Sequence, residues 1–508
     1  MSYATQLALL LTTWEAFELE FSTGIREIVD RHRERLEAIT LQFLQQGVSP
    51  AAVLELETAM TEELRELGRE WVEMLYNMIE AEDAESMPHD VTYQGNGYRR
   101  LNRKTRNAHV ATLFGTIELR RYGYRYWHRD VPEKTIFPLE IQLGLVGGAT
   151  PALAEAAARY TAETGATQAA VLARLKQQHQ VSWGAERLRT VTSEISQAME
   201  QFREFYQVQR ILELLEQAVQ SKGRCKPVLA VGRDGISLRE YRHRCFEVAT
   251  AATMTVYDRR GRRLGTVYLA FSPELGQQRM TDQLTSLIEG VLRNWEGGLP
   301  RLCYVTDAGE SETKYYRRVL KPMRHPRTGA PLEWRRIVDY YHASERIWAM
   351  AEALFGTGEQ QELRARRWAR RMCRLLKQPN GPSRVLHSAA ALRGRLKRIS
   401  AAREKVYRRA YNYLRVRTKY MQYSEYKGKH LPIGSGVTEA ACKIIFTQRL
   451  KLSGMRWSKA GAQTILNLRV ILLSGVWSSV YRGILAAPHA AEVRTYAPNP
   501  ETPHKIAA

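Results

Sequence analysis

The sequence predicts a mixed α/β domain that is interrupted by a long helical insertion and preceded by a helical region, a small β-rich segment and a further group of helices. Three observations lead to this prediction. Apolar runs at 228–231 and 302–305 each end close to an aspartate, as buried strands of an α/β sheet often do. Residues 361–430 hold 21 Lys or Arg but three acids, and residues 1–90 repeat apolar side chains at helical spacing.

Composition restricts the class of protein and of partner. With 508 residues the chain is long enough for about two to four domains, and 44% hydrophobic residues supply their cores. Lys and Arg number 76 against 53 Asp and Glu, so the net charge of +23 favours a polyanion, and double-stranded DNA is the first candidate. No apolar run approaches the roughly 18 to 20 residues that span a bilayer, and no signal peptide is recognisable. We therefore expect a cytoplasmic, nucleoid-associated protein without a membrane partner.

Residues 1–92 are expected to be helical, because their apolar residues recur every three or four positions. The repeating positions are Leu36, Ile39, Phe43, Leu64, Leu67, Trp71 and Leu75. Stripes of this kind form either the core between two helices or a dimer contact. Residues 93–148 are expected to be β-rich, since apolar, aromatic and basic residues alternate from about 109 to 139. Such alternation suits a half-buried sheet or, less often, one that faces nucleic acid.

Residues 149–222 contain three short helical patterns, separated by Gly165 and by a polar turn. Helices of this length joined so tightly are typical of a helix-turn-helix unit, whose last helix would bring Arg187 and Arg189 to DNA. A plain helical bundle explains the same patterns equally well. Residues 201–220 then form a long amphipathic connector.

Residues 223–355 change to the periodicity of an α/β sheet. The predicted elements are strands at 227–239, 246–257 and 264–271, helix 280–295, strand 301–306, helix 311–320 and strand 334–338. A three-stranded meander followed by helix, strand, helix and strand is the element order of a ribonuclease-H-like α/β domain. Residues 356–430 then form the basic helical insertion, and residues 431–480 complete the domain.

Three carboxylates are predicted to form a metal site. Asp234 and Asp307 follow the apolar runs of the first and fourth strands, and Glu439 stands at the start of a helix. Ligands bind at strand ends of α/β sheets, and hard oxygen ligands suit a pair of Mg²⁺ or Mn²⁺ ions in phosphoryl transfer. Each aspartate alone would be an ordinary turn residue. As a set on strand, strand and helix, we expect the three to be catalytic metal ligands.

Basic residues near the acids and in the insertion are the predicted DNA contacts. Lys443 lies one turn after Glu439 and could neutralise a phosphate. The cluster that could hold a DNA end beside the metal ions is Arg449, Lys451, Arg456 and Trp457. The insertion carries a net charge of +18 between 361 and 430 and interleaved aromatic residues, which favours contact with phosphates and unstacked bases. Its expected contacts include Arg393, Arg395, Lys397 and Arg398. Residues 481–508 are expected to be a flexible tail.

Over approximately 108–478 the sequence resembles bacterial insertion-sequence transposases of the DDE type. The resemblance rests on GRDGISL around Asp234, YVTDAGES around Asp307, IVDYYHASERIW around Asp339, and PIGSGVTEAACKIIFTQRLKLSGMR around Glu439. It implies a ribonuclease-H-like catalytic domain whose three acids bind Mg²⁺. It also implies cleavage of DNA by water at transposon ends, followed by strand transfer by the resulting 3′ hydroxyl.

A further acidic motif leaves the second metal ligand open. In related transposases an acid or cysteine, two residues and a histidine follow the second aspartate, and Asp339 with His342 resembles that element. We favour Asp307 as the ligand because it ends the fourth strand, and we treat Asp339 and His342 as a supporting element. Relatives often have the paired cysteines of a zinc ribbon near 122–128, and this sequence has none there.

The predicted function is therefore metal-dependent cleavage and strand transfer at the inverted-repeat ends of a mobile element, by a homodimer or larger assembly. Two alternatives stay open. One is a sequence-specific DNA-binding descendant of a transposase that no longer cuts. The other is a structure-specific nuclease that cuts without rejoining, and strand-transfer products would distinguish it from a transposase.

Overall fold

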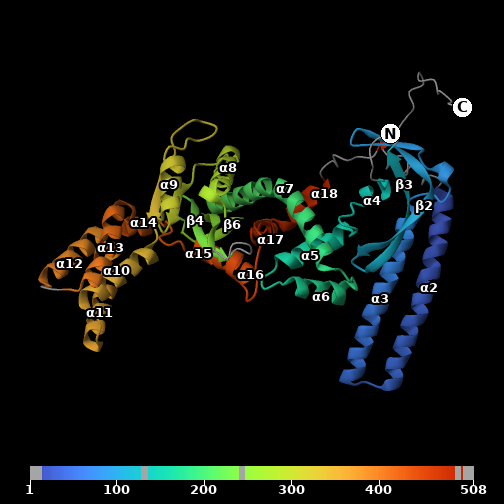
Figure 1. Ribbon diagram of the computed structural model, residues 1–508, viewed down its shortest axis with the longest axis horizontal. Helices are drawn as coiled ribbons and strands as arrows, with labels where there is room; N and C mark the ends of the chain where they lie inside the picture. Colours follow the sequence, from blue (N-terminus) through green and yellow to red (C-terminus); the bar gives the residue numbers. More distant parts are fainter. Residues whose placement is uncertain (1–13, 127–134, 240–245, 397–398, 487–493, 496–508) are drawn as a thin grey trace. The chain divides into compact units, whose positions relative to one another are not determined.

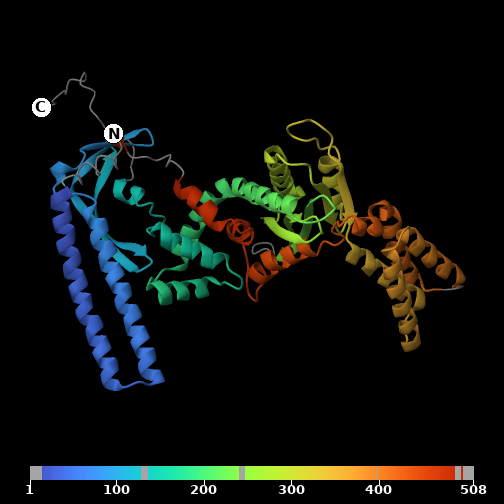
Figure 2. The same ribbon diagram turned by 180° about the vertical axis from the view of Figure 1, so that it is seen from behind.

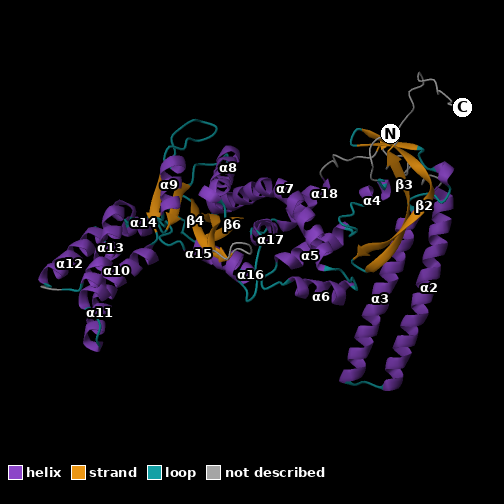
Figure 3. Ribbon diagram, in the orientation of Figure 1, coloured by secondary structure: helices purple, strands orange, loops and turns teal. Residues whose placement is uncertain are grey.

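The structure is a computed structural model that describes residues 14–126, 135–239, 246–396, 399–486 and 494–495 (Figure 1). The chain divides into two compact units. The first holds Met1–Thr161, Ala166–Ile195 and Leu485–Ala508, and the second holds Ala162–Gly165 and Ser196–Ile484. The strands form two separate sheets, one in each unit (Figure 3). Most of the predicted tail, 481–508, lies outside the described residues.

The first unit begins with a helical hairpin, which confirms the prediction for this region. Its helices are α2 (Trp14–Gln46) and α3 (Pro50–Met78). α3 begins at Pro50 because Ser49 Oγ accepts a hydrogen bond from the N–H of Ala52, and because proline suits the first helical turn, where N–H groups lack partners. Ion pairs such as Arg31 with Glu70, at 2.6 Å, link the two helices.

A four-stranded antiparallel sheet packs against the hairpin. Its strands are β1 (Asp90–Tyr93), β2 (Asn96–Thr112), β3 (Gly115–Tyr126) and the short β9 (Arg494–Thr495), in the order β3-β2-β1-β9. The β-rich segment is confirmed, but β2 begins well before residue 109, because its first half is polar and gives no alternating pattern. Tyr122 and Tyr124 are buried and donate hydrogen bonds to the carbonyls of Glu82 and Pro88. These aromatic side chains therefore belong to a half-buried sheet.

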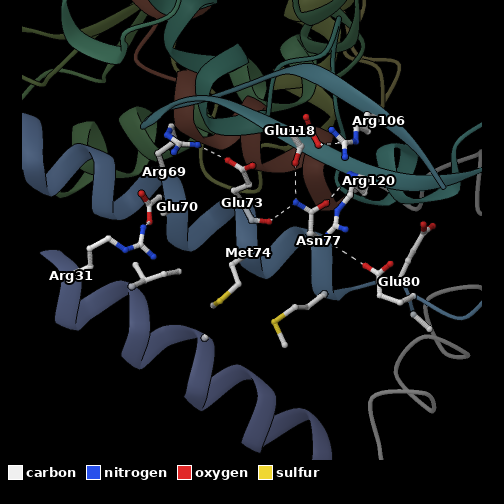
Figure 4. Close-up of a pocket in the computed structure, with 15 residues that line it drawn as sticks. Arg31, Arg69, Glu70, Glu73, Met74, Asn77, Glu80, Arg106, Glu118 and Arg120 are labelled. Carbon is white, nitrogen blue, oxygen red and sulfur yellow. Dashed lines mark hydrogen bonds and ion pairs between the residues drawn. The ribbon is translucent and has the colours of Figure 1, made fainter.

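A cavity of about 700 Å³ lies between α2, α3 and this sheet (Figure 4). Many of the charged side chains that line the cavity form ion pairs with one another. The pairs are Arg31 with Glu70, Arg69 with Glu73, and Arg106 with Glu118. Asn77 donates to the carbonyls of Glu73 and Glu118 and accepts from the N–H of Arg120, so it ties α3 to β3. We attribute this polar network to the packing of the first unit.

Three further helices follow the sheet. After the short α4 (Pro138–Gln142) they are α5 (Pro151–Ala162), α6 (Gln168–His179) and α7 (Ala185–Gln220). The prediction of three helices is confirmed. The third predicted helix and the predicted connector at 201–220 form one continuous helix, α7. Its sequence contains neither glycine nor proline, so no residue in it breaks the backbone hydrogen bonds.

The second unit is built on a five-stranded mixed sheet with the order β6-β5-β4-β7-β8. The strands are β4 (Val228–Arg239), β5 (Phe246–Tyr257), β6 (Arg263–Phe271), β7 (Arg301–Thr306) and β8 (Trp334–Val338). β4, β5 and β6 form an antiparallel meander, while β7 is parallel to β4 and β8 is parallel to β7. The predicted order of elements is confirmed, with β4 as the central strand.

Helices cover both faces of this sheet (Figure 2). Leu229 and Val231 of β4 join a hydrophobic cluster with α7 and α8 (Gln278–Asn294). Val228 and Ala230 point to the opposite face and join a cluster with α10 (Tyr340–Phe355). The alternation of side chains along a strand therefore explains why the whole run is apolar, since both faces are buried. Between β7 and β8 lie α9 (Glu310–Tyr315) and a π-helical turn (Tyr316–Leu320).

The predicted insertion is helical, and it shares a hydrophobic core with one face of the sheet. After α10 its helices are α11 (Glu359–Leu376), α12 (Gly381–Arg395), α13 (Ala401–Arg417) and α14 (Tyr423–Gly428). α11 buries Ala365, Ala369, Met372 and Leu376. Its solvent-facing side carries Arg364, Arg366, Arg367, Arg370, Arg371 and Arg374. The positive charge of this helix is therefore on its exposed face.

The last helices return to the sheet. They are α15 (Gly436–Cys442), a π-helical turn (Lys443–Thr447), α16 (Gln448–Leu450), α17 (Lys459–Leu473) and α18 (Trp477–Ala486). Buried Arg469 of α17 donates to the carbonyls of Ile444, in the π-helical turn, and of Ala162. Within the described residues, no single helix has the length and apolar composition of a membrane span; only α17 and α18 together do, and they are bent by 111° at their junction.

Candidate active site

Asp234 lies on the central strand β4, beside Ala251 of β5. Its carboxylate accepts a hydrogen bond from the N–H of Gly235 at 2.7 Å and lies 3.6 Å from the Cys442 thiol. Burial raises the pKa of Asp234 above its ordinary value, and the negative charges of Asp307 and Glu439 raise it further. The structure thus brings the three predicted acids within electrostatic range of one another, although they are far apart in the sequence.

Asp307 follows β7 in a strained loop. Ala308 has a φ of +65°, which is unfavourable for a residue with a Cβ, and it is buried. The loop is held from within: Asp307 Oδ1 accepts from the N–H of Gly309 at 2.8 Å, and Thr306 Oγ1 accepts from the N–H of Ala308 at 3.2 Å. From α13, Tyr413 Oη donates to the carbonyl of Asp307 at 2.6 Å. The position of the Asp307 carboxylate is therefore fixed by both the sheet and the insertion.

Glu439 is carried by α15, which packs directly on β4. Its side chain is 46% exposed, so it faces solvent as well as the other acids. The Ser435 hydroxyl lies 2.8 Å from Glu439 Oε1 and 2.6 Å from Asp339 Oδ2, and it can donate to one of them at a time. His342 Nε2 lies 3.6 Å from the same Glu439 oxygen. Ser435 and His342 thus connect Glu439 to the acid and histidine motif.

Gly232 allows β4 and α15 to approach. A Cβ at this position would overlap Thr438 Oγ1, which lies 2.8 Å from Thr253 Oγ1. We expect Gly232→Ala to lower the free energy of unfolding by about 1–3 kcal/mol, because the strand and the helix of Glu439 must move apart. Thermal or urea unfolding measures this loss. The double variant Gly232→Ala/Thr438→Ala removes the overlapping oxygen and should recover part of it; equal losses would contradict the explanation.

Asp339 is completely buried and caps α10. Its Oδ1 accepts from the N–H of Tyr341 at 2.5 Å and of His342 at 3.0 Å, and its Oδ2 accepts from both the N–H and the hydroxyl of Ser435. Three N–H groups therefore donate to this carboxylate, and the Ser435 hydroxyl is a fourth donor when it turns to Asp339 and away from Glu439. Burial lowers the pKa of His342, but its hydrogen bond with Glu345 and the charge of Asp339 outweigh that effect, so the pKa is raised. The positions fit the supporting role predicted for this pair.

Glu312 is a fourth acid at the site, and no sequence pattern identifies it in advance. Its side chain is 8% exposed and lies so close to Gly309 that a Cβ there would overlap its carboxylate. Burial raises the pKa of Glu312, and the charges of Asp307 and Asp234 add to the rise. The site therefore concentrates more negative charge than the three predicted acids alone supply.

Excess negative charge of this kind is what a divalent cation would neutralise. Carboxylate oxygens are hard ligands that suit Mg²⁺, so the donor set of Asp234, Asp307 and Glu439 fits the ion that the sequence predicts. Among the described residues, no three His, Cys, Asp or Glu side chains already stand in a metal-binding arrangement. Side-chain rotation, above all of half-exposed Glu439, would be needed to bring the oxygens together.

Two of the predicted DNA contacts after Glu439, Arg449 and Trp457, make contacts within the protein. Arg449 is 2% exposed, and its guanidinium lies 5.3 Å from the Trp457 ring. Burial lowers the pKa of Arg449 to about 10, and nearby Arg469 contributes. The Trp457 indole N–H donates to the carbonyl of Leu450 at 2.9 Å. Arg449 and Trp457 therefore pack α16; Arg449 is too buried to contact DNA in this structure, and half-buried Trp457 stays a predicted contact. Lys443, Lys451 and Arg456 are exposed and available.

Of the other predicted DNA contacts, some are exposed and others bind groups within the protein. Arg187 donates to the carbonyls of Gly147, His109 and Gly148, so it ties α7 to the sheet of the first unit, while Arg189 is exposed. In the insertion, Arg393 pairs with Glu404 at 2.7 Å. Arg395 is exposed. Lys397 and Arg398 lie outside the described residues.

The sequence was also compared with known proteins. No protein-family model matches the chain, and no curated protein matches it significantly.

Proposed function

We propose that the second unit is a ribonuclease-H-like catalytic domain and that the protein is a DDE-type DNA transposase. The strand order β6-β5-β4-β7-β8, with an antiparallel meander followed by two parallel strands, supports the fold. The observation that carries the function is the convergence of Asp234, Asp307 and Glu439 from the central strand, its parallel neighbour and a helix packed on the central strand. These are the positions at which such a fold would assemble a metal site.

In this proposal the three acids would hold Mg²⁺ or Mn²⁺. The ions would supply a stabilising charge for the attacking and leaving oxygens of the phosphoryl group. Cys442 and the N–H of Gly235 orient Asp234, the strained loop orients Asp307, and Ser435 orients Glu439. His342 lies beside Glu439, and its raised pKa favours the protonated imidazole near the proposed reacting oxygens.

The partner would be DNA, namely the terminal inverted repeats of the element and the target duplex, bound by a homodimer or larger assembly. The net charge of +23 and the exposed arginines of α11 favour this partner, because each neutralised phosphate releases condensed counterions. Lys443, Lys451 and Arg456 add exposed cations close to Glu439 along the chain. A descendant that binds without cutting, or a nuclease that does not rejoin strands, would share these features.

An assay with purified protein tests the proposal. The substrate is a labelled duplex that carries the sequence flanking the coding region, incubated with Mg²⁺ and a target plasmid. We expect nicking at the element end and joined products in the plasmid, both abolished by chelation. Cutting without joining would favour the nuclease, and binding without cutting would favour the inactive descendant. A duplex with a scrambled end is the matched control.

A further inference from the structure

Arg346 lies on the same face of α10 as His342, whose Nε2 is 3.6 Å from Glu439 Oε1. It follows His342 by one helical turn, and residues four apart share a helix face. Its guanidinium lies 5.1 Å from the ring of Tyr413, whose hydroxyl reaches the Asp307 carbonyl. The Nε of Arg346 is buried and has no hydrogen-bond partner among the described residues. A fixed cation with unused donor capacity therefore lies next to the Asp307 loop.

A second cation joins it from α13. Arg417 stacks on the same Tyr413 ring at 4.2 Å and donates to the carbonyl of Ala308 at 3.1 Å. Burial lowers the pKa of Arg417, interactions with Tyr413 and Asp307 oppose this effect, and the positive charges of Arg336 and Arg346 add to it, so Arg417 lies within electrostatic range of both other guanidinium groups. The cluster thus holds like charges together at an energetic cost.

The nearby acids do not offset this cost in the working enzyme. Asp339 already accepts hydrogen bonds from three N–H groups. Asp307 would be neutralised by the metal ions that it is proposed to bind. The arginines would then lack a counterion, and a phosphate group is the anion that a nucleic-acid substrate brings to this position. Guanidinium groups bind phosphate oxygens through paired donors, and the buried Nε of Arg346 is a donor that no described residue satisfies.

We propose that Arg346, supported by Arg417 and Tyr413, binds a non-bridging phosphate oxygen of the DNA strand next to the phosphodiester that is cut. This inference rests on the proposed function for the identity of the strand. The subsite lies where the insertion meets the sheet, so it gives the insertion a direct part in placing DNA at the acids. Arg346 would be the residue that contacts the phosphate, and Tyr413 and Arg417 would be positioning residues.

Binding of DNA without cutting tests the subsite separately from catalysis. Fluorescence anisotropy measures the affinity of wild type, Arg346→Gln and Arg346→Lys for a labelled duplex with the flanking end, over a range of salt concentrations. We expect Arg346→Gln to weaken binding about tenfold and to lower the salt slope by about one phosphate contact. Arg346→Lys should keep the slope but recover only part of the affinity, since it retains the charge and loses the paired donors.

Two controls separate a specific contact from general electrostatics. Arg318→Gln removes one exposed positive charge from the same unit and should change affinity by less than about threefold. Duplexes with one uncharged methylphosphonate at successive positions should identify a phosphate whose neutralisation weakens wild-type binding and has no further effect on Arg346→Gln.

The outcomes are decisive without any cleavage. Equal losses in Arg346→Gln and Arg318→Gln, or full sensitivity of Arg346→Gln to every neutralised phosphate, would overturn the subsite. If Arg346→Gln does not fold, the methylphosphonate series on Arg346→Lys replaces it: neutralising the phosphate that weakens wild-type binding should weaken Arg346→Lys less, and equal losses at every position would overturn the subsite. Failure of wild type to cut DNA would instead count against the proposed function and leaves the binding comparison intact.

Discussion

Replacing any one of the three converging acids is expected to stop DNA cleavage while leaving the protein folded and bound to DNA. For Asp234→Asn, Asp307→Asn and Glu439→Gln we expect rates lower by roughly a thousandfold or more, since metal-ion stabilisation of the transition state is worth several kcal/mol. The amide side chains keep the size of the acids but lose the charge that holds a divalent ion. Quantification of nicked and joined products over time, beside anisotropy for binding, measures both effects.

Glu310→Gln is the matched control for these three variants. Glu310 is an exposed acid on α9, close to Asp307 in the sequence, and it pairs only with Lys314 among the described residues. Its replacement removes one negative charge near the site, so a general electrostatic effect would appear there too. We expect its cleavage rate to stay within a few-fold of wild type. Undiminished cutting by Asp234→Asn, Asp307→Asn or Glu439→Gln would remove that residue from the proposed metal site.

Asp234→Asn, which should abolish cleavage, is expected to raise the stability of the folded protein. The folded pKa of Asp234 is raised, so its ionised form is disfavoured by folding, and this penalty appears as pH rises from the unfolded pKa of about 3.9 through the folded pKa. In metal-free buffer at pH 7–8, Asp234→Asn should therefore unfold at a higher temperature than wild type, whereas near pH 3.5 the two should agree. Added Mg²⁺ should stabilise wild type more, because it binds only the folded site.

Much of the fold was predictable because local patterns and tertiary environment agree. The runs before Asp234 and Asp307 are apolar throughout, which only a strand buried on both faces requires, and both are strands of the second sheet. The insertion was recognisable from its charge, and α11 keeps its arginines outside and its alanines inside. β2 was predicted too short because its first half is exposed and polar, so hydrogen bonding to β1 and β3, and not burial, makes it a strand.

Single side chains were harder, because their roles depend on contacts between distant segments. Arg187 and Arg449 are of the residue type expected to contact DNA. In the structure, however, Arg187 donates hydrogen bonds to backbone carbonyls and Arg449 is buried. Glu312 lies in a polar stretch that predicts an exposed helix, and only folding turns it toward Asp307. Tyr413 reaches the carbonyl of Asp307 across 106 positions of sequence. No local pattern encodes such a contact.

Replacement of Asp339 is expected to have the second large effect, a loss in the free energy of unfolding. Removal of its side chain in Asp339→Ala leaves two N–H groups of α10 and the Ser435 N–H and hydroxyl without their acceptor. We expect a loss of about 3–5 kcal/mol in the free energy of unfolding, since buried donors without partners cost about 1–3 kcal/mol each and a lost helix cap about 1 kcal/mol. Urea unfolding followed by circular dichroism measures it.

A comparison of Asp339→Asn with Asp307→Asn tests which of the two aspartates is the second metal ligand. An amide at position 339 must turn its own N–H₂ toward either the α10 N–H groups or Ser435, and donors would then oppose donors. Asp339→Asn should therefore also be destabilised, whereas Asp307→Asn should be as stable as wild type and inactive, because Asp307 Oδ1 accepts only the Gly309 N–H among the described residues. An Asp339→Asn protein of wild-type stability that fails to cut DNA would move the second metal ligand from Asp307 to Asp339. Loss of stability in Asp339→Asn alone would instead assign that carboxylate to the joint between α10 and the segment that leads into Glu439.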